Sequence, residues 1–127
     1  MFNVIFTAMR TTQKSIDACM LRQNVLSNNI ANVDTPNFKR SDVRFEDVLK
    51  NAISNSSNSE ELQNYINNTN PVVYKPNSNN VMRVDGNNVD IDAEMAQLAQ
   101  NTIQYNMLIQ QISGSFKTIS SVINGGK

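Results

Sequence analysis

Acidic and amide side chains gather in one short stretch of the sequence and suggest calcium binding at first. Asp85, Asn87, Asp90 and Asp92 supply the oxygen ligands that calcium prefers. A calcium loop that began at Asp85 would need glycine at its sixth position and glutamate at its twelfth. The sequence has Asp90 and Ala96 at those positions. The spacing therefore argues against a calcium loop and favours a turn that leads into a helix.

The residues that other catalytic and binding sites need are missing. The sequence has no histidine, which is the commonest general base and a common metal ligand. Its single cysteine, Cys19, has no histidine to activate it and falls on the apolar face of a predicted helix, so we expect a small buried side chain. Four glycines cannot supply a phosphate-binding loop at their spacing. We expect no enzyme, no catalytic residue, no cofactor and no metal.

The charge balance excludes some partners. Eleven basic and eleven acidic residues cancel, so net charge suggests neither nucleic acid nor an anionic membrane surface. Lys39, Arg40 and Arg44 lie near two phenylalanines, which is a weak nucleic-acid signal that fits a solvated face or a protein contact better. No apolar run approaches the roughly 20 residues of a membrane span. The N-terminus also lacks a basic region followed by a long apolar run, so we expect no cleaved signal peptide.

The acidic turn leads into the most regular pattern of the sequence, in residues 91–123. Apolar side chains recur there at alternating spacings of four and three, and Thr102 is the exception. Asp90 fits the N-cap, and Asn124 with the two glycines after it fits the end. A helix of about 33 residues is roughly 50 Å long and must pack against other helices. The predicted seam positions of this helix are Ile91, Met95, Leu98, Tyr105, Ile109, Ile112, Phe116, Ile119 and Ile123.

The N-terminal part of the chain, residues 3–31, repeats this spacing. Thr12 and Gln23 interrupt the apolar stripe, and the first residues are weak helix formers, so we expect the first turns to fray in a free monomer. The predicted seam positions on this side are Ile5, Met9, Ile16, Leu26 and Ile30. We predict that the two terminal helices pack as an antiparallel coiled-coil hairpin.

The first helix is predicted to end before a proline. Pro36 disfavours a helical conformation at Thr35, and Asn32 is suited to close the last turn in the left-handed conformation. Phe38, just beyond the proline, either contacts a neighbouring molecule or folds back onto this helix.

The fold class we predict is all-α, in one domain. It consists of an N-terminal helix in residues 1–33, an irregular middle segment in 34–84, and a turn plus the C-terminal helix in 85–127. The middle is rich in Asn and Ser, so we expect it to be loosely ordered.

The middle segment still carries weak signals of local structure. Residues 45–53 have the spacing of a short amphipathic helix, with Ser41 or Asp42 as possible caps. Residues 60–66 fit one or two weak helical turns, and Val72-Val73-Tyr74 has strand character.

Two motifs resemble those of bacterial flagellar rod and hook proteins. The segment Asn-Ile-Ala-Asn-Val-Asp-Thr-Pro-Asn-Phe-Lys, residues 29–39, is similar to the N-terminal signature of that family, roughly N-I-A-N-x-x-T-P-G-Y-K. The run from Asp85 to Asp92 is similar to a segment particular to the proximal rod subunit. Asn37 stands where the family has glycine, and Phe38 where it commonly has tyrosine; asparagine tolerates the positive φ of such a turn. The motif residues are Asn29, Ala31, Asn32, Thr35, Pro36, Phe38, Lys39, Asp85, Gly86, Asn87, Asn88, Val89 and Asp90.

This resemblance implies a structural subunit of the proximal rod of the flagellar basal body. Such a subunit is exported by the flagellar type III apparatus without a cleaved signal, polymerises through its terminal helices in the periplasm and transmits torque. The implied partners are other copies of the chain, other rod subunits, proteins of the membrane ring and export gate, and a small adaptor subunit. A different rod subunit, and a coiled-coil adaptor or export chaperone of the flagellar secretion system, are the alternatives.

Overall fold

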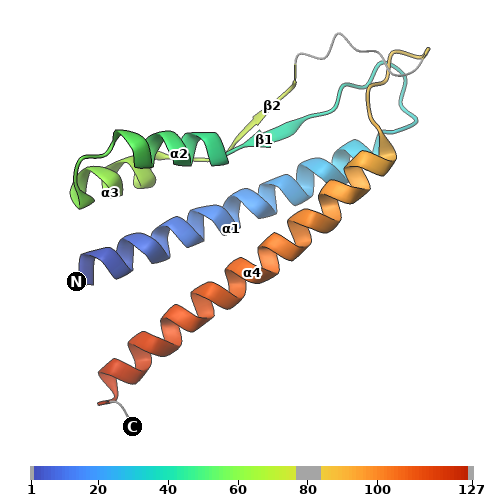
Figure 1. Cartoon of the computed structure of the whole chain (residues 1–127). Helices are drawn as coiled ribbons and strands as arrows, with labels where there is room; N and C mark the ends of the chain where they lie inside the picture. Colours follow the sequence, from blue (N-terminus) through green and yellow to red (C-terminus); the bar gives the residue numbers. More distant parts are fainter. Residues whose placement is uncertain (1, 77–83, 126–127) are drawn as a thin grey trace.

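The computed structural model describes residues 2–76 and 84–125 (Figure 1). Its elements, in chain order, are α1 (Phe2–Ala31), β1 (Asp42–Arg44), α2 (Glu46–Asn55), α3 (Ser59–Asn68), β2 (Val72–Tyr74) and α4 (Ile91–Ile123). The fold is mainly helical, as predicted. The strictly all-α class is wrong in one detail, because β1 and β2 pair as a small antiparallel sheet with Val43 opposite Val73.

The two long helices α1 and α4 pack against each other. They run in opposite directions and lie closest where α1 ends and α4 begins, and they diverge toward the two chain termini (Figure 1). No helix in the described part of the chain combines the length and apolarity that a membrane crossing needs.

Both ends of α4 follow the local sequence signals. The Asp90 carboxylate accepts hydrogen bonds from the backbone N–H groups of Asp92 and Ala93, at 3.0 and 3.2 Å, and so caps the first turn. The helix stops at Ile123, and Gly125 follows with a φ of 74°. The predicted start and stop of this helix are therefore confirmed.

The end of α1 differs from the prediction. The backbone N–H of Asn32 still bonds the carbonyls of Asn28 and Asn29, so Asn32 continues the helical turn and does not take the left-handed conformation. Among the described residues other than glycine, only Asn37 has a positive φ, at 60°. The chain therefore reverses at Asn37, where the sequence motif has its expected turn.

The middle segment is more ordered than expected. Helix α2 begins after Phe45 without a side-chain cap, and neither Ser41 nor Asp42 caps it because both lie on the approach to or within β1. Helix α3 has ten residues instead of one or two weak turns; the Asn58 side chain caps it by accepting from the Glu61 N–H at 2.9 Å, and the helix packs against α1 and α2. Val72–Tyr74 forms β2, as its strand character predicted.

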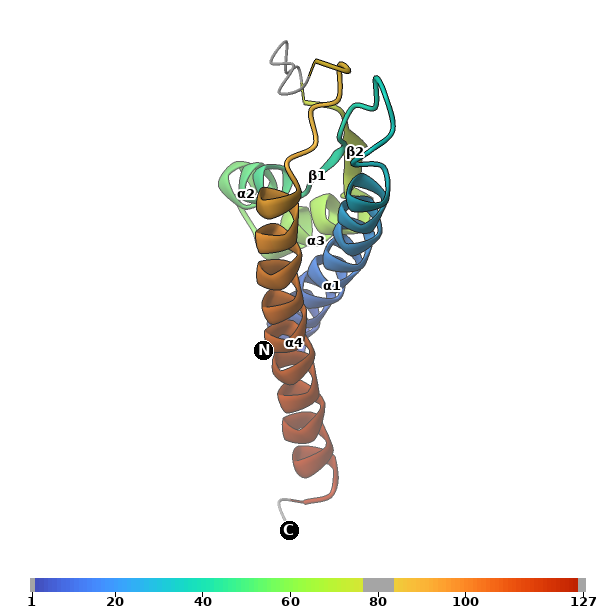
Figure 2. The same cartoon turned by 90° about the vertical axis from the view of Figure 1, so that its right-hand side faces the viewer.

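A small core holds α2, α3 and the sheet against α1. Figure 2 shows the middle segment behind and beside the two long helices. The apolar residues buried in the described structure are Ala18, Cys19, Leu26, Val43, Phe45, Ala52, Ile66 and Val89. Cys19 is only 3% exposed, which confirms the expected buried thiol, and burial raises its pKa.

Candidate functional site

The two sequence motifs, which are far apart in the chain, meet where α1 ends and α4 begins. The Asn37 N–H donates to the Asp85 carbonyl at 3.0 Å, and the Lys39 ammonium donates to the Gly86 carbonyl at 2.6 Å. We call residues 29–41 and 85–94 together the motif junction. One of these bonds joins two backbone groups and the other joins a side chain to the backbone, so the two segments hold each other directly.

Gly86 is required at this junction for two reasons. Its φ of 81° lies in the region that residues with a Cβ rarely adopt. A Cβ built there would also lie 2.6 Å from the Oδ1 atom of Asn37, which is closer than such atoms approach. Asn37, in the family's glycine position, thus packs directly against Gly86 of the other motif.

Asn87 closes the last turn of α1 from the other motif. It is fully buried, and its Nδ2 lies within 3.0 Å of the carbonyl oxygens of Asn32, Val33 and Thr35. Its Oδ1 accepts from the N–H of Val89 at 2.7 Å. The last carbonyls of a helix have no hydrogen-bond partner within the helix. Here a single side-chain amide, in the turn before α4, bonds three carbonyls at the end of α1. Asn87 performs the capping role that the sequence suggested for Asn32.

Glu94 is the charged centre of the junction. It is 1% exposed, and Arg40 Nε donates to one of its carboxylate oxygens at 2.6 Å while Asn29 Nδ2 donates to the other at 2.9 Å. Asn29 also donates to the carbonyl of Ser41 at 2.8 Å and accepts from the Ser41 N–H at 3.0 Å. The buried carboxylate is therefore both paired and hydrogen-bonded, which is the condition for tolerating it.

Sequence reasoning missed Glu94 and Arg40 as members of this site. From the sequence alone, Glu94 is an acidic residue in the predicted first turn of the C-terminal helix, where it favours the helix dipole, and Arg40 belongs to a basic cluster that fits a solvated face or a protein contact. The backbone N–H of Arg40 also donates to the Asn88 side chain at 2.8 Å, so this residue joins both motifs. The available signal was position: Arg40 directly follows the first motif, and Glu94 lies two residues after the run from Asp85 to Asp92.

The remaining motif residues lie around this centre. Thr35, Pro36 and Asp90 are exposed, and Ala31 is an exposed residue at the end of α1. The Thr35 hydroxyl bonds the Asn32 side chain at 3.1 Å, which stiffens the turn before the proline. Of the other motif residues, Asn88 and Val89 are buried, and Phe38, Lys39 and Asp85 are half-buried.

The predicted seam of α4 divides into two sets. The face toward α1 is marked by Glu94 and Asn101, which bond Asn29 and the Cys19 carbonyl. Leu98, Tyr105, Ile112 and Ile119 are half-buried along α4. The other predicted positions are between 36% and 77% exposed: Ile91, Met95, Ile109, Phe116 and Ile123. We call this second set the exposed stripe.

The seam of α1 is better covered. Leu26 is 1% exposed, while Met9, Ile16 and Ile30 are half-buried, and Ile5 near the N-terminus is 38% exposed. Helix α3 contributes to this cover with surface hydrogen bonds, such as the one from Arg10 to Asn67 at 2.6 Å.

A bidentate ion pair fastens α2 to α1. The two terminal nitrogens of Arg22 donate to the two carboxylate oxygens of Glu46 at 2.6 and 2.7 Å. The hydrogen bond from Arg22 holds the pKa of Glu46 below its usual value, and the same bond raises the pKa of Arg22.

The chain is similar to known proteins over nearly its whole length. The family model described as flagella basal body rod protein matches residues 7–39. The chain is 32% identical to flagellar basal body rod protein FlgB of Bacillus subtilis (strain 168), over 94% of this chain and 95% of that protein. It is 38% identical to FlgB of Borrelia hermsii, over 95% and 98% of the two chains. FlgB of Escherichia coli (strain K12) is 29% identical over 99% of each chain.

Proposed function

Because this chain belongs to the FlgB family of flagellar basal body rod proteins, we propose that it polymerises through its terminal helices into the proximal rod. Membership makes it a structural subunit of the basal body rod and not an enzyme. The proposal adds the way in which it assembles. Its main support is the exposed stripe, which leaves large apolar side chains of α4 in water when the chain is alone.

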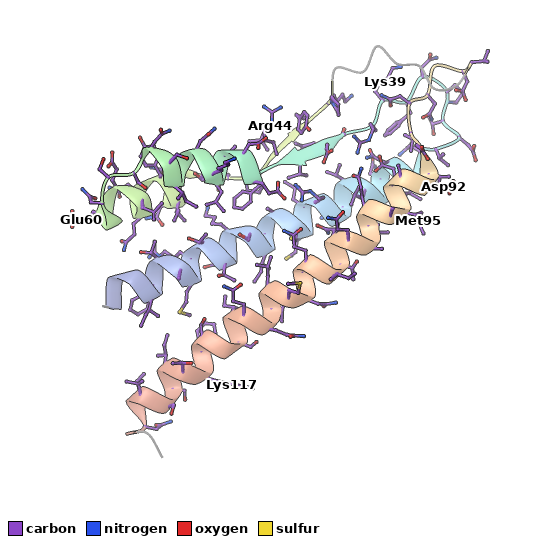
Figure 3. The ribbon with its side chains drawn as sticks, in the orientation of Figure 1. Lys39, Arg44, Glu60, Asp92, Met95 and Lys117 are labelled. Atoms are coloured by element: carbon purple, nitrogen blue, oxygen red, sulfur yellow. The ribbon has the colours of Figure 1, made fainter. Side chains whose placement is uncertain are left out.

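The charge pattern of α4 supports the same proposal. No Asp, Glu, Lys or Arg occurs between Met95 and Phe116, although much of this stretch is exposed. Figure 3 places Asp92 at one end of α4 and Lys117 near the other. A helix that stays in water usually carries charges on its exposed face. A long uncharged helix with exposed Ile103 and Met107 fits burial between subunits.

The motif junction gives the assembled helices a fixed geometry. Its buried polar groups are hydrogen-bonded on both motifs, and such networks specify one arrangement more than they add free energy. In the proposed rod, α1 and α4 of each subunit would keep their relative position under load, and torque would pass from one layer to the next. The subunit would reach the periplasm through flagellar type III export without a cleaved signal.

We further propose the partners of this subunit. They are other copies of the chain, other rod subunits, and the membrane-ring and export-gate proteins, with a small adaptor subunit between them. Different surfaces of one chain would meet in each contact, since contacts of that kind build open helical assemblies when the rotation between copies does not close a ring.

Fractionation tests this function. A tagged full-length chain, expressed from its own gene in the source bacterium, should copurify with isolated basal bodies and resist salt washing. A coiled-coil adaptor or export chaperone would remain in the cytoplasmic fraction. Recovery there alone, with basal bodies free of the chain, would refute the proposal.

A further inference from the structure

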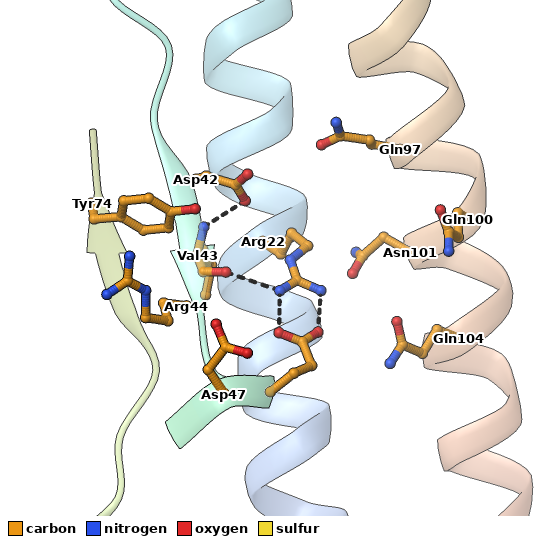
Figure 4. Close-up of a pocket in the computed structure, with 11 residues that line it drawn as sticks. Arg22, Asp42, Val43, Arg44, Asp47, Tyr74, Gln97, Gln100, Asn101 and Gln104 are labelled. Carbon is orange, nitrogen blue, oxygen red and sulfur yellow. Dashed lines mark hydrogen bonds and ion pairs between the residues drawn. The ribbon is translucent and has the colours of Figure 1, made fainter. Parts of the chain in front are cut away.

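A polar groove lies between β1 and α4. It has a volume of about 450 Å³, and Gln97, Gln100, Asn101 and Gln104 of α4 form one of its walls (Figure 4). Arg22 of α1 lies between the strand and this wall. The residues of α4 that line the groove are amides, whereas those of the exposed stripe are apolar, so the two surfaces lie on different sides of α4.

Both arginines of the groove already contact other side chains. Arg22 binds the Glu46 carboxylate with both terminal nitrogens, and its Nη2 also donates to the Val43 carbonyl at 2.9 Å. The Arg44 guanidinium lies 4.6 Å from the centre of the Tyr74 ring. Internal pairing of this kind leaves no strong net charge to attract an ion, so the groove suits an uncharged polar group.

One donor and one acceptor in the groove are left over. Asn101 is 2% exposed, and its Oδ1 has no hydrogen-bond partner in the described structure. The orientation of this amide is fixed, because its Nδ2 donates to the carbonyl of Cys19, which can only accept. Arg22 Nη1 uses one of its two hydrogens on Glu46. The Asn101 side chain points from α4 toward Arg22 (Figure 4), whose terminal nitrogens face the Glu46 carboxylate.

The outer edge of β2 presents one backbone donor and one backbone acceptor, which complement the acceptor and the donor of the groove. The N–H of Val43 bonds the Asp42 side chain at 2.7 Å, and its carbonyl accepts from Arg22, so both groups point away from β2. Val43 and Val73 therefore form a non-hydrogen-bonded pair of the ladder. The N–H and carbonyl of Val73 consequently face the outer edge, where Val72 and Val73 are 55% and 45% exposed.

Strand β2 also matches the groove in length and in its lack of charge. The groove's α4 wall, from Gln97 to Gln104, spans about 10 Å at the rise of a helix. Three residues of an extended strand span about 10 Å as well. Residues 63–74, which lead into and include β2, contain no charged side chain.

We propose that strand β2 of a second copy of this chain docks in the groove between β1 and α4. The Val73 N–H of that copy donates to Asn101 Oδ1, and its Val73 carbonyl accepts the free hydrogen of Arg22 Nη1. The contact joins two different surfaces, so it repeats from copy to copy, and it builds an open helix when the rotation between copies does not close a ring. This proposal rests on the proposed function, because it requires copies to lie side by side in a rod.

Disulfide trapping between two chains tests the contact. One chain carries Val73→Cys and the other Gln104→Cys, since Gln104 is an exposed residue of the groove wall. Asn106→Cys is the control, because it is exposed on the opposite side of α4. The native Cys19 is buried and common to all the chains. The pairs are oxidised in basal bodies and as purified chains at high concentration.

We expect a disulfide-linked pair of chains with Val73→Cys and Gln104→Cys, at least tenfold more abundant than with Asn106→Cys. Equal yields, or no linked pair in either preparation, would overturn the proposed contact. If the chain is present in basal bodies without this link, the contact fails while the rod function stands. If the chain is absent from basal bodies, the rod function fails and the purified chains still decide the contact.

A substitution that removes one backbone N–H provides a second test of the contact. Val73→Pro removes the N–H that faces outward but no hydrogen bond between β1 and β2, and edge strands tolerate proline in that position. Sedimentation of the full-length chain should show self-association weakened about tenfold, with an unchanged circular dichroism spectrum. A folded Val73→Pro variant that associates like the unmodified chain would contradict the contact. If this variant does not fold, the trapping experiment decides.

Discussion

Single residues at the motif junction have roles that substitution can separate. Gly86 makes room for Asn37, Asn87 supplies a cap to α1, and Glu94 neutralises a partly buried Arg40. Each of these roles depends on atoms from the other motif. The junction is therefore sensitive to changes that would be harmless on an isolated helix or turn.

Gly86→Ala should destabilise the chain. The new methyl group meets Asn37 Oδ1, and alanine is strained at a φ of 81°. We expect a loss of about 1–3 kcal/mol in the free energy of unfolding, measured by urea denaturation. Gly114→Ala is the matched control, because nothing lies within 4 Å of its added Cβ and it is inside a helix. That control should be neutral or stabilising by up to about 1 kcal/mol. Equal effects of the two substitutions would contradict the role of Gly86.

Glu94→Gln should be more damaging than a change of an exposed acid on the same helix. It removes the counter-charge of Arg40, whose side chain is 19% exposed, and we expect a loss of about 3 kcal/mol on urea denaturation. Asp92→Asn, at an exposed position of the first turn, should cost only about 0.5 kcal/mol. Adding Arg40→Met to Glu94→Gln should recover part of the loss, since no guanidinium then lacks its buried counter-charge and only the partly exposed Asp42, 3.4 Å from Arg40, loses an ion pair. Similar costs for Glu94→Gln and Asp92→Asn would refute the paired-charge account.

Secondary elements differ in how far the sequence alone predicts them. The start of α4 was predictable because the Asp90 cap needs only backbone groups two and three residues ahead. Helix α3 was underestimated, since its cover comes from contact with α1 and α2 and not from its own weak pattern. The apolar period marked the seam of α4, but a period cannot say which side meets α1.

The buried pairing inside the junction was beyond sequence reasoning. Glu94 meets Arg40 across 54 residues of chain and Asn29 across 65. Considered one at a time, Glu94, Arg40 and Asn29 are residue types that usually lie on the surface. Only the turn at Asn37, bonded to Asp85, brings them together. The resemblance of the two motifs to a family indicated that they matter, without indicating that they touch.

The stabilisation that the Arg22–Glu46 ion pair gives to the contact between α1 and α2 should decrease at low pH. Arg22 lowers the pKa of Glu46 in the folded chain, so the pair stabilises the fold at pH values above the usual pKa of a free glutamate. This stabilisation is lost as the pH falls through the lower, folded pKa. Thermal melts should show a stability difference between the unmodified chain and Glu46→Gln at neutral pH that shrinks in acid. A difference that stays constant down to about pH 3 would contradict the pairing.

Helix α4 should tolerate charge on its exposed stripe as long as the chain is alone. Ile109 and Phe116 are 36% and 58% exposed, so Ile109→Asp with Phe116→Asp should leave the circular dichroism spectrum of the free chain nearly unchanged. The same double variant should be missing from basal bodies, and cells that carry it should not swim. Asn106→Asp with Gln110→Glu, which adds the same charge at two exposed polar positions of α4, is the control. Normal swimming of the double variant would count against the stripe as an assembly surface.

At the scale of the whole molecule, order is unevenly distributed. The buried contacts concentrate at the motif junction and beneath α2 and α3, while the second half of α4 diverges from α1 and exposes Met107, Phe116 and Ile123 (Figure 1). Helices of that kind gain most of their stability from packing. The chain thus combines the motif junction, which is ordered in the single subunit, with helix ends that neighbouring subunits would bury.

Hydrogen exchange of the backbone amides, compared between the free chain and purified basal bodies, tests this account most directly. Amides of Leu26–Ala31 and of the first turns of α4 should be protected in both states, because the motif junction exists without neighbours. Amides from Met107 to Ile123 should exchange quickly in the free chain and at least a hundredfold more slowly in basal bodies. Equal exchange of the Met107–Ile123 segment in the two states would contradict its burial on assembly.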